Sequence, residues 1–420
     1  MVDFCIYDNF LDEENFSNGE YLTEEEHRTH KHSTHVEDIP LIDGKSGVKK
    51  AIDVLVAVKD RFGVSDGNAH QIISTKIDGA PAIVSGWIGN KFFVATKSLF
   101  NKEPKVNFTD DDIDTNHGDK KELADKLKIA LKYFKDIIPK GTIVQGDFLY
   151  GTKDKKSEAI DGVAHWTWHP NTIKYAIVKD TPLGKKIGLS KVGIVFHTRY
   201  KINGEDIHSI SLAGFDVMSS EFKSNKDVWV TDAFQKNLGS IPHFNADENK
   251  VFDALAKDAN SLAGGVPWDW VKLYGYDYVM PFLNDYIKRC VGYPTTNQMY
   301  SDLISWLETK KNNEILSKKT DKFKQKVVEK YTPILNAPKG IVNLFRIYKD
   351  ITEMKMMIIR KINLIKSTKT FLLKRDGTLV SVEDEGYCLT QTSANGCKLV
   401  DRLQFSAANF SDMFKHGFEK

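Results

Sequence analysis

The chain has 420 residues, of which 41% are hydrophobic and 28% are charged. These proportions are typical of folded proteins and exclude wholesale disorder, and the length predicts two or three domains. The 59 lysines and arginines nearly balance the 57 aspartates and glutamates. Net charge therefore gives no argument for a polyanionic partner, and any nucleic-acid surface has to come from local clustering of charge.

Neither membrane insertion nor secretion is expected. The sequence contains no apolar run long enough to span a bilayer, and its acidic start, MVDFCIYDNFLDEENF, lacks the basic and apolar regions of a secretory signal. Four cysteines without a C-x-x-C pair argue against a disulfide framework and against a cysteine zinc site. We expect a cytoplasmic protein with reduced thiols.

Residues 1–35 show no clear hydrophobic period, which predicts an irregular segment. The periods in residues 36–205 predict an α+β region. Helical spacing predicts one helix from Val48 to about Gly63 and another over residues 123–138. Alternating or β-rich stretches predict strands, and the Gly-Asn pair after APAIVSGWI predicts a hairpin turn. The expected strands are HQIISTK, APAIVSGWI, KFFVATKSLF, TIVQGDFLYG, TIKYAIV and GIVFHTRY.

The composition then changes. Residues 206–366 carry longer periods and little strand signal, which predicts a mainly helical module, with its clearest helix between Ile341 and Ile365. Over residues 367–420 the strand signal returns as two hairpins, TFLLK with TLVSV and EGYCLTQ with CKLVDR. We therefore expect an α+β fold with antiparallel sheets, interrupted by a helical insertion.

The first candidate for chemistry is the string Lys76-Ile77-Asp78-Gly79, where a strand is expected to end in a turn. The Asp-Gly pair favours a tight turn that holds the lysine beside a ligand. A neutral lysine amine can act as a nucleophile. Taken alone, the string more often marks a turn that carries a solvated lysine.

Further blocks, in a fixed order, resemble the covalent nucleotidyltransferase superfamily of ATP-dependent RNA and DNA ligases and capping enzymes, most closely its phage-encoded RNA ligases. The string TKIDGAPAIVSG resembles the family's K-x-D-G block, which makes Lys76 the expected covalent nucleotide carrier. Lys97 stands where the family has a basic residue, 97−76 = 21 positions later, and Asp147 in GDFL stands where it has Glu. The resemblance also places the neighbours of the lysine in the nucleotide site: Thr75, Ile77, Asp78 and Gly79.

The later blocks of the resemblance lie on three strands. Phe196 in GIVFHTRY is expected to stack on the base, and Glu385 in EGY is expected to serve the ribose or a metal together with Asp147. Lys398 in KLV is expected to contact the α-phosphate. Where the family has a second lysine this chain has Val400, and Arg402 is the expected substitute. A metal-bound triphosphate needs such a combination of carboxylates and cations.

The resemblance implies a nucleotidyltransferase domain in residues 36–205 and 367–420 that uses ATP and Mg²⁺, or Mn²⁺, and acts in the cytoplasm of the host if a phage encodes it. RNA ends are the expected substrate, because DNA ligases and capping enzymes carry an oligonucleotide-binding barrel after the last lysine, and only 420−398 = 22 residues follow Lys398. The alternatives are a DNA ligase, a GTP-using capping enzyme, and an inactive nucleic-acid-binding or virion-associated protein of the same fold.

Two other clusters of residues can each be interpreted in two ways. Lysines gather between residues 310 and 330, either as a solvated face or as a phosphate-contact surface, with Lys318, Lys319 and Lys322 as the candidate nucleic-acid contacts. Four histidines in HRTHKHSTH, from His27 to His35, have spacing that zinc could use, but no partner completes a pattern, so a solvated segment is favoured.

Overall fold

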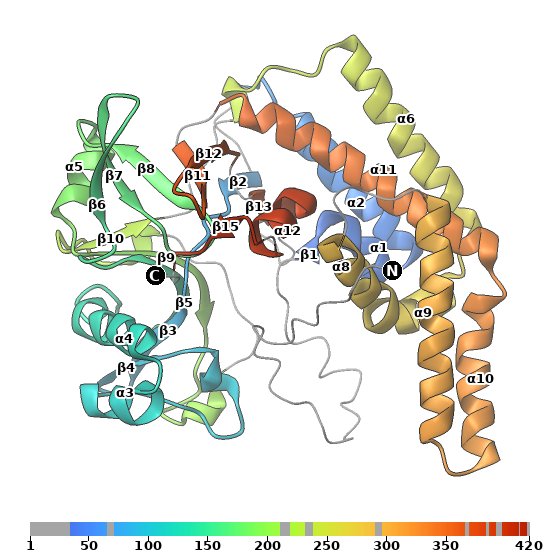
Figure 1. Ribbon diagram of the computed structural model, residues 1–420, viewed down its shortest axis with the longest axis horizontal. Coiled ribbons are helices and arrows are strands. Elements are labelled where there is room, and N and C mark those ends of the chain that lie inside the picture. The colour runs from blue at the N-terminus through green and yellow to red at the C-terminus, as the bar shows by residue number, and fades with distance from the viewer. Residues whose placement is uncertain are drawn as a thin grey trace.

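The computed structural model has an α+β fold with antiparallel-rich sheets on one side and long helices on the other (Figure 1). This confirms the expected fold class in general terms. The structure describes residues 34–64, 71–210, 219–231, 238–289, 296–365, 369–383, 386–391, 397–410 and 412–417.

The first sheet joins the beginning and the end of the described chain. Its strand order is β1-β14-β13-β2, with β1 parallel to β14 and the other pairs antiparallel. Of the two late strands, β13 pairs with β2, and β14 lies between β13 and β1. The strands are β1 (Thr34–His35), β14 (Cys397–Val400), β13 (Gly386–Gln391) and β2 (Gln71–Thr75).

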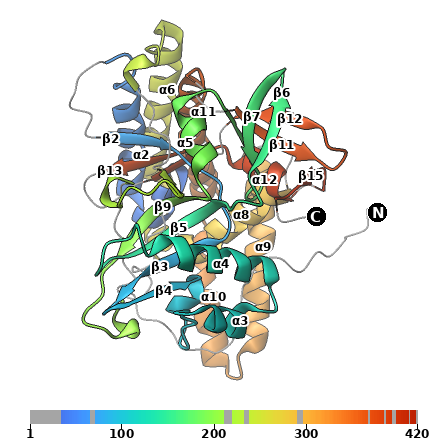
Figure 2. The same ribbon diagram turned by 90° about the vertical axis from the view of Figure 1, so that its left-hand side faces the viewer.

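The second sheet has the order β10-β9-β5-β3-β4. Its members are β10 (Val228–Thr231), β9 (Val192–Tyr200), β5 (Ile143–Tyr150), β3 (Ala82–Ile88) and β4 (Lys91–Ala95). The hairpin between β3 and β4 was predicted, and Gly89 there has φ +56°, which favours glycine. The helices α3 (Asp110–His117) and α4 (Lys121–Phe134) lie beside this sheet, and α4 crosses its face (Figure 2).

The third sheet has the order β12-β11-β8-β7-β6, and β15 also pairs with β11. Sequence analysis missed its hairpin β6–β7, because residues 156–160 are mostly exposed and carry no apolar alternation. The Asp161-Gly162 turn, with positive φ at both residues, was the available signal. The elements are β12 (Leu379–Val382), β11 (Lys369–Lys374), β8 (Lys174–Val178), β7 (Val163–Trp168), β6 (Lys156–Ile160), β15 (Phe414–Lys415) and the adjacent helix α5 (Pro182–Leu189).

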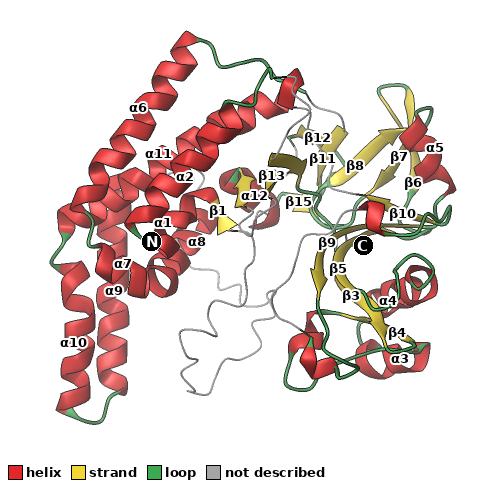
Figure 3. Cartoon of the chain, turned by 180° about the vertical axis from the view of Figure 1, so that it is seen from behind, coloured by secondary structure: helices red, strands yellow, loops and turns green. Residues whose placement is uncertain are grey.

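The remaining helices form the other half of the molecule. The hairpin of α9 and α10 projects away from the sheets as an arm, which is seen from both sides (Figures 1 and 3). The helices are α1 (Ile39–Asp43), α2 (Lys45–Lys59), α6 (Ala246–Leu262), α7 (Trp268–Tyr274), α8 (Met280–Arg289), α9 (Thr296–Ser317), α10 (Asp321–Leu335), α11 (Pro338–Asn363) and α12 (Arg402–Phe410). Short helical turns cover Val36–Asp38, Lys97–Phe100, Ile207–Ser209, Ser219–Glu221, Leu238–Ser240, Ala263–Gly265 and Gly275–Val279.

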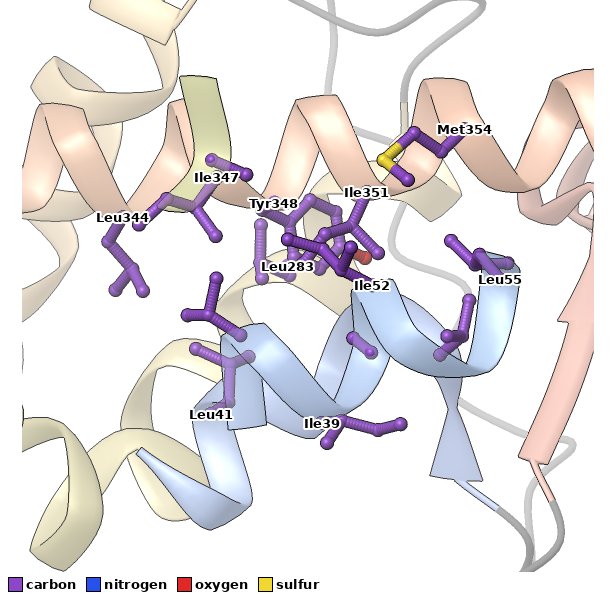
Figure 4. Close-up of a cluster of buried hydrophobic side chains, with 14 of the residues drawn as sticks. Ile39, Leu41, Ile52, Leu55, Leu283, Leu344, Ile347, Tyr348, Ile351 and Met354 are labelled. Atoms are coloured by element: carbon purple, nitrogen blue, oxygen red, sulfur yellow. The ribbon is translucent and has the colours of Figure 1, made fainter. Parts of the chain in front are cut away.

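The helix α11 forms the centre of the largest core. Its Leu344 and Ile351 face Leu41 and Ile52 of the first two helices (Figure 4). Each such buried side chain contributes roughly 1.5–3 kcal/mol relative to an exposed one. The same core contains Leu399 and other apolar residues of the first sheet, so the helical residues and that sheet share one interior.

The expected helical module begins later than residue 206. Its first long helix starts at Ala246, and β10 in the preceding segment extends the second sheet beside β9. The helical insertion therefore starts after a strand that belongs to the sheet region.

Candidate active site

Lys76 stands immediately after β2. Its backbone N–H donates to the carbonyl of Gly386 at 2.8 Å, which continues the pairing of Thr75 with Tyr387 on β13. Thr75 is buried, whereas Lys76 is half-buried. The Nζ atom of Lys76 lies 5.6 Å from the centroid of the Phe405 ring on α12. The lysine is thus attached to a hydrogen-bonded sheet and partly covered by an aromatic ring.

Lys398 lies on the same face of the first sheet as Lys76. In register, Lys398 stands opposite Cys388, and Val400 stands opposite Gly386, to which Lys76 is bonded. Alternation directs the intervening Leu399 into the core and both lysines to the other face. Strand spacing separates the two lysine Cα atoms by about 12 Å.

Asp78 holds the lysine loop against the third sheet. Its carboxylate accepts hydrogen bonds from the backbone N–H groups of Thr172 and Ile173, at 2.8 and 3.1 Å, and from Asn171 Nδ2 at 2.9 Å. Ile77 is also buried, in an apolar cluster with Ile173. Nucleotide contact by Asp78 and Ile77 was expected, but three protein donors occupy the carboxylate and the Ile77 side chain is in the core. The structure gives both residues a positioning role.

Asp147 packs directly against the same loop. A Cβ atom at Gly79 would lie 2.8 Å from Asp147 Cβ, and the N–H of Ala80 donates to the carbonyl of Phe148 at 3.0 Å. The Asp147 side chain is 29% exposed, and its Oδ1 lies 3.7 Å from Nε2 of His197. A solvent-accessible carboxylate therefore adjoins the lysine loop.

Phe196 does not face a nucleotide site. Its ring is 3% exposed, stacks on Phe222 with centroids 4.5 Å apart, and meets Phe134 of α4 edge-on at 5.6 Å. The expected stacking on a base is therefore wrong for this residue. The physical reason is the strand period, because Ile194 and Phe196 share the face that packs on α4. His197 points to the opposite face, beside Asp147.

Arg402 is enclosed in a buried ion-pair network. Its Nη1 lies 3.1 Å from Asp38 Oδ1 and donates to the Tyr348 hydroxyl at 2.7 Å, and Nη2 donates to Asn284. The expected phosphate contact is therefore wrong, because a buried carboxylate already balances this charge. Withdrawing Arg402 toward a phosphate would leave Asp38 buried without its partner.

A second ion pair adjoins the first. Lys355 Nζ lies 2.6 Å from Glu37 Oε1, and both side chains have no exposed surface. Burial alone would raise the pKa of Glu37, but the charges of Lys355 and Arg402 outweigh that effect and hold the pKa below its ordinary value. Burial lowers the pKa of His35 to about 3; Glu37 opposes this change, and Arg402 adds to it. His35 is therefore neutral at neutral pH.

The remaining expected contacts lie elsewhere. Lys97 is exposed and begins the short helical turn after β4, at the edge of the second sheet. Lys318, which is half-buried, and Lys319, which is exposed, lie in the connection between α9 and α10, and the exposed Lys322 lies in the first turn of α10. Figure 3 shows this connection at the tip of the arm. Glu385 lies outside the described residues, as do His27, His30 and His32.

The carboxylate that adjoins the lysine loop is compatible with a magnesium ion. Over the part of the chain that the structure describes, no group of three or more His, Cys, Asp and Glu side chains is arranged to hold a metal ion. Magnesium does not need such a cage, because it is usually held by one or two carboxylates together with substrate phosphates. The accessible carboxylate of Asp147 meets this requirement.

Sequence reasoning missed two residues that contact the lysine loop region. Phe405 lies over Lys76, and Lys126 of α4 donates to the carbonyl of Ala80 at 3.1 Å. Burial lowers the pKa of Lys126, and the nearby acidic groups oppose this. Neither residue belongs to a motif, and only the packing of α12 and α4 brings them to the site.

Comparison with protein families places most of the chain in one family. A family model described as a family of unknown function (DUF6267) matches residues 30–414. Comparison with curated proteins and with solved structures gives no significant match. No helix among the described residues is long and apolar enough to cross a membrane. Since the match covers most of the 420 residues, the chain belongs to the DUF6267 family.

Proposed function

We propose that the chain is an ATP-dependent RNA ligase with a nucleotidyltransferase domain, in which Lys76 carries AMP covalently. One observation carries the proposal. Lys76, at the end of a strand, is joined to the loop that packs on Asp147 and shares a sheet face with Lys398, although these residues are far apart in the sequence. A nucleophile, a carboxylate and a second cation are the groups that nucleotidyl transfer needs near one another.

The reaction has three steps. The neutral amine of Lys76 attacks the α-phosphorus of ATP, an N–P bond forms, and the bond to pyrophosphate breaks. A 5′-phosphate of RNA then attacks the same phosphorus, which releases the lysine and forms an adenylylated end. Finally a 3′-hydroxyl attacks the 5′-phosphate and expels AMP. Dividing one difficult condensation into displacements of this kind is the advantage of covalent catalysis.

The side chains at the site have distinct roles in these steps. Asp78 fixes the loop, so that Lys76 meets the phosphate in one orientation. Lys398 is suited to neutralise the α-phosphate. Asp147 would hold a bound Mg²⁺ or Mn²⁺, which supplies positive charge to the phosphates when present. Thr75 and Gly79 shape the backbone on either side of the reacting amine.

The arm is the proposed contact for RNA. Between residues 310 and 330 the chain has eight lysines and three acidic residues, so 8 − 3 = +5 charges gather in a short stretch. Lys318, Lys319 and Lys322 lie at its tip. Phosphate contacts of this kind add affinity without sequence preference.

A second candidate is a nucleic-acid-binding protein of the same fold without catalysis. The buried positions of Phe196 and Arg402 favour it, because two expected nucleotide contacts are already engaged within the protein. A DNA ligase and a GTP-using capping enzyme are the enzymatic alternatives.

Covalent labelling separates these functions. The purified protein is incubated with Mg²⁺ and α-labelled ATP or GTP and then denatured. Label from ATP that is absent in Lys76→Ala supports the proposal, and label from GTP alone indicates a capping enzyme. Sealing of nicked duplex DNA with no joining of RNA ends would indicate a DNA ligase. Binding of RNA without label from either nucleotide would favour the non-catalytic function.

A further inference from the structure

The helix α12 brings an aromatic ring to the candidate nucleophile. The centroid of the Phe405 ring lies 5.6 Å from Lys76 Nζ. The ring is half-buried, and it lines a small pocket together with Asp78, Ile173, Leu372 and Asn409. A nucleotide joined to Lys76 through its α-phosphate would have its sugar and base in the immediate neighbourhood of this ring.

Both ends of α12 are anchored. Arg402 at its first turn pairs with Asp38 at 3.1 Å, and Asn409 near its last turn accepts a hydrogen bond from the Thr172 hydroxyl at 2.9 Å. Thr172 in turn donates its backbone N–H to the Asp78 carboxylate at 2.8 Å. The chain of contacts from Asp78 through Thr172 to Asn409 therefore fixes α12 relative to the lysine loop. The position of the Phe405 ring follows from these anchors.

We propose that Phe405 is the aromatic surface against which the nucleoside of a nucleotide on Lys76 is held. This inference rests on the proposed function. It assigns to α12 the contact that the buried ring of Phe196 cannot make. In the resting protein the ring faces the Lys76 ammonium, an arrangement favoured by cation–π attraction.

Formation of the covalent intermediate changes this contact. The neutral amine attacks the α-phosphorus, and pyrophosphate leaves. The nitrogen then loses one of its two protons to solvent. The nitrogen in the resulting N–P bond carries no positive charge, so its attraction to the ring disappears. The ring face is then available to the sugar or base, which is the sequence-tolerant contact that aromatic side chains provide.

The test compares variants of Phe405 in the full chain. Labelling is measured as a function of α-labelled ATP concentration for the wild type and for Phe405→Leu, Phe405→Tyr and Phe405→Ala. We expect the ATP concentration at half-maximal labelling to rise about tenfold in the Leu and Ala variants, because stacking on a base is lost. Tyr retains an aromatic face and restores a near wild-type value. Leu keeps an apolar side chain on α12, so it remains informative if the Ala variant does not fold.

Phe410→Ala is the matched control on the same helix. Its ring is exposed and lies 4.9 Å from Lys288 Nζ, and this variant should label like the wild type. Unchanged ATP dependence in both Phe405→Leu and Phe405→Ala would overturn the inference and leave the proposed function intact.

Equilibrium binding separates failure of the inference from failure of the proposed function. Dissociation constants for ATP are measured with the wild type and with Phe405→Leu under non-turnover conditions. If the wild type binds ATP but takes no label, covalent catalysis is refuted, and a weaker constant for Phe405→Leu still supports the contact. If the wild type binds neither ATP nor GTP, the inference and the proposed function are both refuted.

Discussion

Lys355 and Glu37 form an ion pair of 2.6 Å in which neither side chain has any exposed surface. Lys355 lies on α11, the central helix of the largest core, and Glu37 lies in the turn after β1. The pair joins the central helix to the turn that follows β1 of the first sheet. Arg402 of α12 lies 3.9 Å from the same carboxylate, so the network also reaches the helix that covers Lys76.

Removing one member of this pair should be strongly destabilising. Lys355→Met leaves the Glu37 carboxylate buried without its main partner, and we expect the free energy of unfolding to fall by about 3–5 kcal/mol. Urea unfolding measures the change. The double variant Lys355→Met with Glu37→Gln should recover much of the loss, since it removes the unpaired charge. A loss below about 1 kcal/mol in the single variant would show that the pair is not structurally important.

His35 should make stability depend on acidity. Its pKa in the folded protein is lowered to about 3 from 6.5, so the unfolded chain binds the proton more readily. The contribution of His35 to the free energy of unfolding is therefore fully present above pH 6.5, and it is lost as the pH falls toward 3. The slope of this contribution reaches at most about 1.4 kcal/mol per pH unit.

The variant His35→Gln isolates this effect from the other groups of the network. Burial raises the pKa of Asp38 to about 6, which acts in the opposite direction over part of the same range. The difference between wild type and variant cancels that contribution. Between pH 4 and 7, the midpoint temperature of thermal unfolding should depend less steeply on pH in the variant than in the wild type. Parallel curves for the two proteins would contradict the assignment.

The fit between Gly79 and Asp147 should be essential for activity. A methyl group at Gly79 would meet Asp147 Cβ at 2.8 Å and the Phe148 carbonyl at 3.0 Å, both within a sheet that cannot move cheaply. Overpacking of this kind costs about 1–3 kcal/mol. Gly79→Ala should therefore slow labelling of Lys76 at least tenfold. Gly264→Ala, where nothing lies within 4 Å, is the control and should label normally.

Reversing the charge at the tip of the arm should affect joining but not labelling. We expect a triple variant to take up AMP as the wild type does but to join RNA ends more weakly. It combines Lys318→Glu, Lys319→Glu and Lys322→Glu. The dependence of RNA binding on salt should also become shallower, because fewer counterions are released. Lys185→Glu with Lys186→Glu on α5 changes exposed charges on the opposite half of the molecule and serves as the control. Equal loss of joining in both variants would exclude a specific role for the arm.

Local patterns predicted part of the fold. The apolar stripe from Ile341 to Ile365 became α11, and the two late hairpins became β11–β12 and β13–β14. Sequence reasoning failed where tertiary contacts decide the outcome. The hairpin β6–β7 carries exposed residues on both strands, and β10 joins the second sheet through a parallel pairing that no local signal encodes.

The sequence likewise predicted only part of the candidate site. Ordered motifs predicted that Lys76 and Asp147 lie together, and the contact of Gly79 with Asp147 is consistent with that prediction. The motifs gave no information on which face a strand side chain takes, so the buried position of Phe196 was missed, although the continuous apolar run from Val192 to Phe196 indicated burial. The pairing of Arg402 with Asp38 and the approach of Phe405 depend on how α12 packs, which a single sequence does not specify.

The central claim is that Lys76 becomes covalently bound to AMP. The most direct measurement is mass spectrometry of peptides from the protein after incubation with ATP and Mg²⁺. We predict an AMP adduct on the peptide that contains Lys76, fragment ions that assign it to this residue, and no adduct in Lys76→Ala. An adduct on another lysine that persists in Lys76→Ala, or no adduct under conditions in which the protein binds ATP, would contradict the claim.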